Sequence, residues 1–351
     1  MNVINLSYGH IEDSFFDSEY IKETIKKGSY NLDFSNYSIP GGKMELRESI
    51  AKNFSYNLLY KNSCTSVSTN LSFYILNKIF SKSVLAISPI YSNFHKQLVL
   101  DGISFFEESY DDFSKNVIDY KKYNDCLCVI VYPNNPTGEL CSLEILEDNI
   151  KRMKENGITC VIDISWINSI YSGKNVVDIK DIAKFVNKYN SIILLGFTKI
   201  FGVTSIRCSG VLAQERIIDK FINLHDMLAV SCGQLDEYLV GEFIKKAPIY
   251  WDRVREDLKR KVKFVLKKIA ESKLNIEYIL PKSGIFLYFI LDTPIDIGKT
   301  LSECKERGLL VYSSKDFENK ACGFRISVNN SVEELDKGLE ILFKSIENNI
   351  I

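Results

Sequence analysis

The chain has little net charge, no long apolar run and no CxxC pair of cysteines. Of its 351 residues, 44 are Lys or Arg and 45 are Asp or Glu, which leaves a net charge of −1. The short basic runs KRMK and KRKVK are typical of solvated helix faces, so we expect no binding to nucleic acid or to an anionic membrane. No apolar stretch approaches the roughly 18 residues of a membrane span, and the first residues lack the basic and apolar segments of a secretion signal. We therefore expect a soluble protein.

The nine cysteines are scattered, and none of them stands in a CxxC pair. Cys126 and Cys128 alternate within an apolar stretch, so their side chains are expected on one face of a strand. Core packing is therefore a better interpretation of this pair than metal binding, and no metal site is expected anywhere in the chain. Unpaired cysteines also favour a reducing, cytoplasmic location.

The order of apolar and polar segments predicts an α/β fold. A chain of this length suits one large domain and a smaller companion. From about residue 69, apolar strands alternate with helical segments, and runs such as IILLG and VIVY are apolar on both faces. Such runs are typical of strands buried between helix layers in a mostly parallel sheet. We predict an N-terminal arm and helix over residues 1–40, a large domain over 41–245, and a small α+β domain over 246–351.

The stretch VYPNNPTG, residues 131–138, ends an apolar strand on a rigid polar turn. Proline fixes φ and lacks an N–H, whereas Asn and Gly accept tight turns. Polar groups also follow other strands: Asp163 comes after TCVI, and Lys199 comes after ILLGF. A fourth group is the turn 68–70 at a helix start, where free N–H groups favour an anion. Because ligands gather at the carboxyl ends of parallel strands, we expect these groups to share one site.

These motifs, in this order, resemble fold-type I pyridoxal-phosphate (PLP) enzymes of the class I/II aminotransferase kind. NNPTG matches that family's Asn-Pro-Thr-Gly loop, VIDISW its Asp-x-x-aromatic strand, and GFTKIFGVTSIR its Ser/Thr-Lys with Arg eight residues later. YSIPGGKMELRESIA, SPIY and FRISV resemble three further segments of the family. The resemblance extends from about residue 3 to residue 347. It implies an aminotransferase that acts on an L-amino acid and a keto acid with PLP as cofactor.

The resemblance also implies a role for each matching residue. Lys199 is expected to form the Schiff base with PLP and to move the substrate proton. Asp163 is expected to pair with the pyridinium nitrogen of the cofactor. Asn135 is expected to bind the phenolic oxygen of the cofactor and to contact the substrate. Tyr91 is expected to stack on the cofactor ring.

Further residues are expected to bind the two anionic groups. For the cofactor phosphate the resemblance implies Thr198, Arg207 and the N–H groups of Asn70 and Leu71. Tyr37 is expected to reach the phosphate of a second subunit, which implies a homodimer with shared active sites. For the substrate carboxylate the resemblance implies a bidentate grip by Arg325.

Three features depart from the family pattern. Trp166 stands where a tyrosine is usual, Gly196 stands where many members place a phosphate-binding Ser or Thr, and the helix start STNLSFY lacks the usual glycine. We therefore expect PLP to bind with an altered set of hydrogen bonds, in which Trp166 lines the cofactor site.

Other activities remain open at this point. INLSYGH and the aromatic residue at 166 resemble PLP-dependent arginine oxidases and cyclases, in which a histidine near the N-terminus lies by the cofactor, so His10 is a candidate substrate-binding residue. A decarboxylase of the threonine-phosphate kind is a further alternative. A non-catalytic dimeric homologue is disfavoured, because a purely structural role would not require all five residue types together at Lys199, Asp163, Asn135, Arg207 and Arg325.

Overall fold

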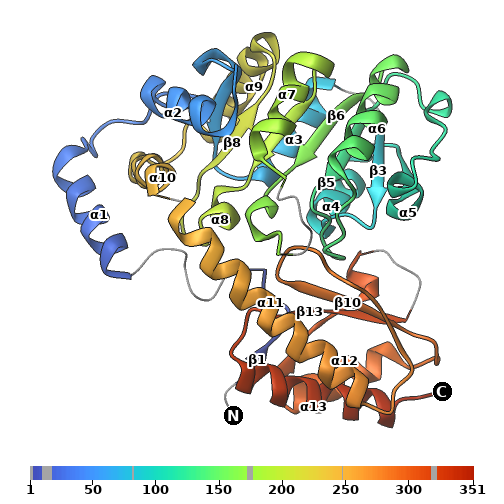
Figure 1. Cartoon of the computed structure of the whole chain (residues 1–351). Helices are drawn as coiled ribbons and strands as arrows, with labels where there is room; N and C mark the ends of the chain where they lie inside the picture. Colours follow the sequence, from blue (N-terminus) through green and yellow to red (C-terminus); the bar gives the residue numbers. More distant parts are fainter. Residues whose placement is uncertain (1–2, 10–17, 81–82, 172–176, 247, 318–321) are drawn as a thin grey trace.

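The structure, a computed structural model, describes residues 3–9, 18–80, 83–171, 177–246, 248–317 and 322–351. The larger part of the chain is built around a seven-stranded sheet (Figure 1). In spatial order, its strands are β2 (Ser63–Ser66), β8 (Ser209–Leu212), β7 (Ile192–Leu195), β6 (Thr159–Asp163), β5 (Leu127–Val131), β3 (Val84–Ser88) and β4 (Phe105–Ser109). The predicted mostly parallel sheet is confirmed, with β8 as the exception, because it is antiparallel to both β2 and β7.

Both faces of this sheet are buried, as its apolar strands predict. Along β5, Cys128 and Ile130 belong to one core, whereas Leu127, Val129 and Val131 belong to the other. The first core also contains side chains of α2 (Met44–Phe54), α6 (Leu143–Glu155) and α7 (Ile179–Tyr189). The second contains side chains of α3 (Thr69–Phe80), α4 (Ser92–Leu100) and α9 (Glu215–Ala229). The sheet is thus the middle of three layers.

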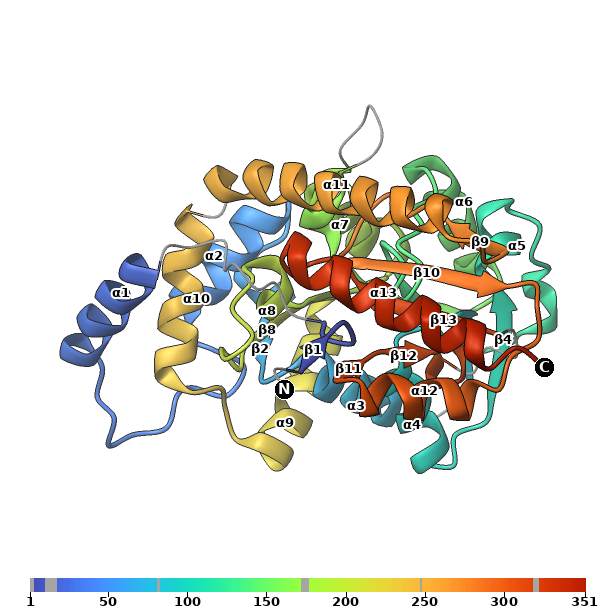
Figure 2. The same ribbon diagram turned by 90° about the horizontal axis from the view of Figure 1, so that it is seen from below.

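The small domain is a four-stranded antiparallel sheet covered by helices. Its strands, in spatial order, are β12 (Tyr312–Ser313), β13 (Gly323–Ser327), β10 (Phe286–Leu291) and β9 (Ile276–Ile279). Its helices are α11 (Pro248–Glu271), α12 (Ile297–Glu306) and α13 (Val332–Asn348). Helix α13 contacts both α11 and α12 and lies between them in Figure 2. Its start is fixed by a capping box, in which Ser331 and Glu334 satisfy each other's backbone N–H groups.

The N-terminal strand pairs with the small domain, and the residues after it lie beside the large sheet. Strand β1 (Ile4–Asn5) pairs in parallel with β11 (Leu309–Leu310) of the small domain. The N–H of Ser327 also donates to the carbonyl oxygen of Leu6 at 2.6 Å. This pairing places the following residues, 7–9, beside the carboxyl ends of the large sheet.

The remaining elements connect these layers. They are helices α1 (Ser18–Asn31), α5 (Tyr110–Ser114), α8 (Phe197–Ile200) and α10 (Gln234–Lys246), with short 3₁₀ turns η1 (Tyr60–Asn62), η2 (Tyr120–Lys122), η3 (Ile167–Ser169) and η4 (Ser314–Phe317). In the part of the chain that the structure describes, no helix is both long enough and apolar enough to cross a membrane. Cys126 and Cys128 lie in the same core, as their alternation predicts, and all nine cysteines are free.

Candidate active site

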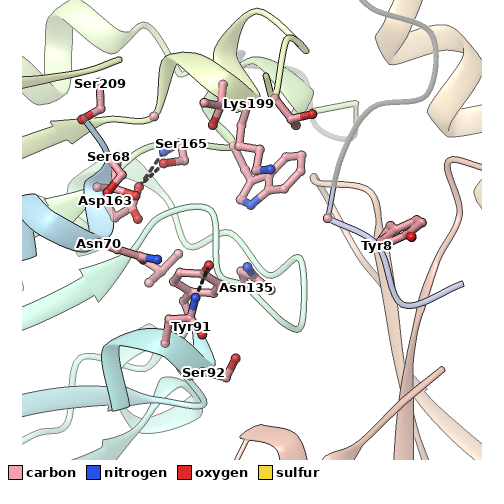
Figure 3. A pocket seen from close by; sticks show the side chains of 18 of the residues that line it. Tyr8, Ser68, Asn70, Tyr91, Ser92, Asn135, Asp163, Ser165, Lys199 and Ser209 are labelled. Atoms are coloured by element: carbon pink, nitrogen blue, oxygen red, sulfur yellow. Dashed lines mark hydrogen bonds between the residues drawn. The ribbon is translucent and has the colours of Figure 1, made fainter. Parts of the chain in front are cut away.

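A cavity of about 440 Å³ lies at the carboxyl ends of β5, β6 and β7. Its walls come from the large domain, from the small-domain strands β10, β12 and β13, and from residues 7–9 (Figure 3). The structure brings most of the predicted site residues to this one cavity: Asn70, Tyr91, Asn135, Asp163, Trp166, Thr198, Lys199, Arg207 and Arg325. Leu71 and Tyr37 do not line it, and His10 lies outside the described residues.

Lys199 is held by the short helix α8, which begins directly after β7 and Gly196. The N–H of Lys199 donates to the carbonyl oxygen of Gly196 at 2.8 Å, which closes the first turn. Burial, together with the charges of Arg207 and Arg325, lowers the pKa of the Lys199 amine to about 8. Burial disfavours the charged amine, so a substantial neutral fraction exists near neutral pH. A neutral amine is the nucleophilic form, which a covalent link to a carbonyl compound requires.

Asp163 is the last residue of β6 and is only 4% exposed. Burial raises the pKa of its carboxyl to about 6, against the opposing effect of hydrogen bonds from Ser165. The Ser165 hydroxyl donates to Asp163 Oδ1 at 2.5 Å, and the Ser165 N–H donates to the same oxygen at 2.9 Å. Ser165 was not predicted from the sequence, although an aspartate at a strand end commonly accepts from the backbone N–H two residues on. The carboxylate is thus fixed in orientation at the cavity wall.

The VYPNNPTG turn is rigid because its first asparagine binds its surroundings. The Asn134 side chain donates to the carbonyl oxygen of Pro89 at 2.9 Å and accepts from the Thr137 hydroxyl at 2.8 Å. Asn134 thereby links the turn to the segment that carries Tyr91, whose hydroxyl accepts from the Asn93 side chain at 2.9 Å. Asn135, the next residue of the turn, lines the cavity. The prolines and asparagines of this turn therefore hold Asn135 and Tyr91 in place.

Arg325, on β13, is a buried cation that is 4% exposed. Its guanidinium carbon lies 3.8 Å from the ring centre of Phe286, 4.8 Å from that of Phe317 and 5.0 Å from that of Tyr312. It donates to the carbonyl oxygen of Ser7 at 2.8 Å.

The guanidinium of Arg325 is not neutralised by an acid. It donates to Asn135 Oδ1 at 3.3 Å, while its Nε has no partner among the described residues. Burial lowers the pKa of Arg325 to about 10. No carboxylate in the described ranges forms an ion pair with it, so the cavity offers this cation to an anionic ligand.

The opposite end of the cavity is rich in donors. Ser68, Thr69 and Asn70 line it at the start of α3, together with Thr198 and Arg207. The N–H of Leu71 donates to the Ser68 hydroxyl at 3.1 Å and is therefore already used inside the helix start. Leu71, one of the two predicted N–H donors to the phosphate, thus already has a partner within the chain. Hydroxyl groups, a helix start and a guanidinium form a binding site that suits a phosphate.

Two of the predicted site residues, Trp166 and Tyr37, differ widely in exposure. Trp166 is 5% exposed, packs edge-on against Phe286 at 5.5 Å between ring centres, and has the Lys199 amine 5.8 Å from its ring centre. Tyr37 is 83% exposed. Its predicted contact with a second subunit stays a prediction.

The residues of the cavity fit PLP with an amino acid. A buried amine suits the aldehyde of the cofactor, the Asp163 carboxylate suits its ring nitrogen, and the donor-rich end suits its phosphate. The Arg325 guanidinium suits a substrate carboxylate. A family model described as aminotransferase class I and II matches residues 1–342 of the chain. The chain belongs to this family.

Known proteins of this family resemble the chain along nearly its whole length. An aromatic-amino-acid aminotransferase 2 of Thermococcus litoralis is 24% identical, over 98% of this chain and 92% of that protein. An aspartate aminotransferase of Pyrococcus abyssi is also 24% identical, over 98% and 91%. Among solved structures, an α-aminoadipate aminotransferase of Thermus thermophilus, complexed with a phosphopyridoxyl-leucine, has a TM-score of 0.88 at 17% identity, covering 99% of this chain and 92% of that chain.

This class I/II aminotransferase is therefore a PLP-dependent enzyme with amino acid and keto acid substrates. The predicted fold, activity and cofactor are confirmed. Nothing in these comparisons favours the oxidase, cyclase or decarboxylase alternatives.

Proposed function

We propose that this aminotransferase transfers an amino group between an L-amino acid and a keto acid in the cavity described above, with Lys199 as the residue that binds PLP covalently. The observation that carries the proposal is the buried Lys199 amine, whose pKa is lowered to about 8, in one cavity with the Asp163 carboxylate and the unneutralised Arg325 guanidinium. Such perturbed groups concentrate at catalytic sites.

Each group of the cavity has a proposed task. PLP, when bound, withdraws electrons from the Cα of the amino acid that it carries. Lys199 removes the proton at that Cα and returns it on the cofactor side. Asp163 holds the ring nitrogen in its protonated form. Asn135 donates to the phenolic oxygen, and Tyr91 packs on the ring. Trp166 lines the same cavity and would supply no hydroxyl to that oxygen.

The phosphate is proposed to lie at the donor-rich end. Ser68, Thr69, Asn70 and Thr198 supply hydroxyl and N–H donors there, and Arg207 supplies a positive charge. Together these groups orient the cofactor relative to Lys199.

Transamination predicts a specific dependence on the acceptor. The purified protein, loaded with PLP, is incubated with a panel of L-amino acids with and without 2-oxoglutarate. We expect the keto acid product in catalytic amounts only when the acceptor is present, with no oxygen uptake. Keto acid formed without an acceptor, and in proportion to the oxygen consumed, would replace this proposal with an oxidase.

Arg325 is proposed to bind the substrate α-carboxylate. Removing one partner of a buried charged pair costs roughly 2–5 kcal/mol, so Arg325→Leu should lower kcat/KM for amino acids by roughly 30-fold to several thousand-fold, mainly through KM. Arg325→Lys keeps the charge but not the planar fork of donors, so its kcat/KM should lie between those of the wild type and Arg325→Leu. Amines that lack the α-carboxylate should react equally with Arg325→Leu and the wild type. An unchanged KM for amino acids in Arg325→Leu would exclude this role.

We also propose a homodimer in which Tyr37 binds the phosphate of the partner. The support is a run of exposed apolar side chains around it: Tyr30 at 79%, Phe34 at 60%, Ile39 at 58% and Met44 at 50% exposure. Single apolar side chains on a surface are ordinary, but several exposed ones within one short segment favour an interface. Sedimentation equilibrium should give twice the chain mass of 40.2 kDa.

A cytoplasmic location is proposed because all nine cysteines are free thiols, and a cell-fractionation experiment tests it.

A further inference from the structure

The side chain of Ser165, two residues after Asp163, packs against the backbone of Gly196. The backbone of Gly196 has φ −79° and ψ 82°, so the left-handed region is not involved and its conformation does not require glycine. What excludes a side chain is space: a Cβ atom at position 196 lies 2.1 Å from the Ser165 Oγ and 2.7 Å from the Ser165 Cβ. The Ser165 hydroxyl therefore occupies the volume that any side chain at 196 needs.

The Ser165 hydroxyl uses this volume to reach Asp163. Both donors of Ser165, the hydroxyl and the N–H, are directed to Oδ1 of the carboxylate. In the described residues, Oδ2 accepts no hydrogen bond, although Asp163 lines the cavity. Figure 3 shows Asp163 and Ser165 joined by these two bonds at the cavity wall, with Tyr8 on the opposite side. The two oxygens of the carboxylate thus differ: Oδ1 is held by Ser165, and Oδ2 has no hydrogen-bond donor among the described residues.

We propose that Ser165 is a positioning residue that orients and acidifies Asp163, and that Gly196 is its necessary companion. The proposal rests on the proposed pairing of Asp163 with the PLP ring nitrogen. Two donors on Oδ1 stabilise the ionised carboxylate against its burial and leave Oδ2 to face the cofactor. This explains the glycine at 196, where a Ser or Thr would supply a possible phosphate ligand: any side chain at that position would collide with the Ser165 hydroxyl.

The first test measures the ionisation of Asp163 directly. In the PLP-free chain labelled with ¹³C at the Asp carboxyl carbons, the Asp163 signal is identified by its loss in Asp163→Asn. Its midpoint in the wild type is expected near pH 6. Ser165→Ala removes one donor to the charged form, so the midpoint should rise, by about one pH unit for a hydrogen bond to a charge. Ser165→Cys retains a weak donor and should shift the midpoint less.

A matched control separates this effect from the loss of any buried hydroxyl. Ser191 is fully buried at the opposite end of β7, and its hydroxyl has no partner among the described residues. Ser191→Ala should leave the Asp163 midpoint unchanged. A wild-type midpoint in Ser165→Ala, or an equal shift in Ser191→Ala, overturns the proposal.

PLP binding provides a second readout. With midpoints near pH 6 and pH 7, the ionised fractions of Asp163 at pH 6.5 differ about threefold. The dissociation constant for PLP should therefore be about threefold higher for Ser165→Ala than for wild type at pH 6.5, and the two values should converge by pH 9. If Asp163→Asn binds PLP like wild type at every pH, the role of Asp163 itself fails. If Asp163→Asn weakens binding but Ser165→Ala does not, only the Ser165 proposal fails.

Gly196 is tested by exchanging the two residues. Gly196→Ala should displace the Ser165 hydroxyl, raise the Asp163 midpoint and lower the melting temperature. Ser165→Gly combined with Gly196→Ala removes the collision and should recover the melting temperature, while the Asp163 midpoint stays raised because the hydroxyl is absent. A midpoint restored to the wild-type value in the double variant, or no difference between Gly196→Ala and wild type, contradicts the proposed pairing of these residues.

Discussion

Lys199→Ala is expected to lower the transamination rate by roughly 10⁴-fold or more, because it removes both the covalent anchor of PLP and the proton-transfer group. Borohydride reduction of the wild type should attach the cofactor to the peptide that contains Lys199, and mass spectrometry detects this adduct. The control is Lys282→Ala: this amine donates to the carbonyl oxygen of Leu140 and does not line the cavity. It should keep both the rate and the adduct. An adduct of equal yield in Lys199→Ala would show that another amine binds PLP.

The pH dependence of PLP capture follows from the same residue. The neutral amine is the nucleophile, so the rate of covalent capture by the cofactor-free chain should rise as the pH increases through about 8, the lowered pKa of Lys199, and then level off. An ordinary lysine has a pKa of about 10.4, so its capture rate would still be rising at pH 10. Stopped-flow absorbance distinguishes these two profiles.

Much of the candidate site could be predicted because it lies at strand ends. Asn135, Asp163 and Lys199 each follow an apolar run, and parallel strands place their carboxyl ends at one edge of a sheet. Local chain signals are sufficient there. The predicted sheet is also correct in its parallel part, but the reversal of β8 depends on pairing with β2, far away in the sequence.

The parts that the sequence did not reveal depend on contacts between distant segments. Ser7 reaches Arg325 because β1 pairs with β11, more than three hundred residues away. The reason for Gly196 lies in the position of Ser165, in the turn that follows the neighbouring strand β6. Neither contact can be predicted from the residues that are its neighbours in the sequence. At the start of α3, the Ser68 cap redirects one N–H group, which a count of helix positions does not reveal.

The aromatic rings around Arg325 could not be predicted from the sequence either. The arginine itself follows from the FRISV motif, but the rings around it come from Phe286 on β10, Tyr312 on β12 and Phe317 on η4. These segments are brought together by the small sheet. Three aromatic rings surround the guanidinium, and no carboxylate among the described residues forms an ion pair with it, so the buried cation is available to an anionic ligand.

Asp163→Asn is expected to lower kcat by at least roughly 10²-fold while PLP still binds through Lys199 and the phosphate groups. The carboxylate stabilises positive charge on the ring nitrogen in a buried site, and removing one such preorganised electrostatic partner costs ~3 kcal/mol or more. The asparagine has nearly the same shape, so the loss reports charge rather than packing. Asp181→Asn, which removes only the pairing with Lys184 on α7, should retain the wild-type rate.

The acid side of the pH profile gives an independent check on Asp163. In the cofactor-free chain, burial raises the pKa of this carboxyl to about 6, and a positively charged ring nitrogen beside it would lower that pKa again. The protonated carboxyl no longer stabilises a positive ring nitrogen, so kcat of the PLP-loaded wild type should decline only at a pH below 6. Asp163→Asn has no such group, so its low residual rate should not show this decline. A near wild-type kcat in Asp163→Asn, with the same decline below pH 6, would assign the ring-nitrogen contact to a different residue.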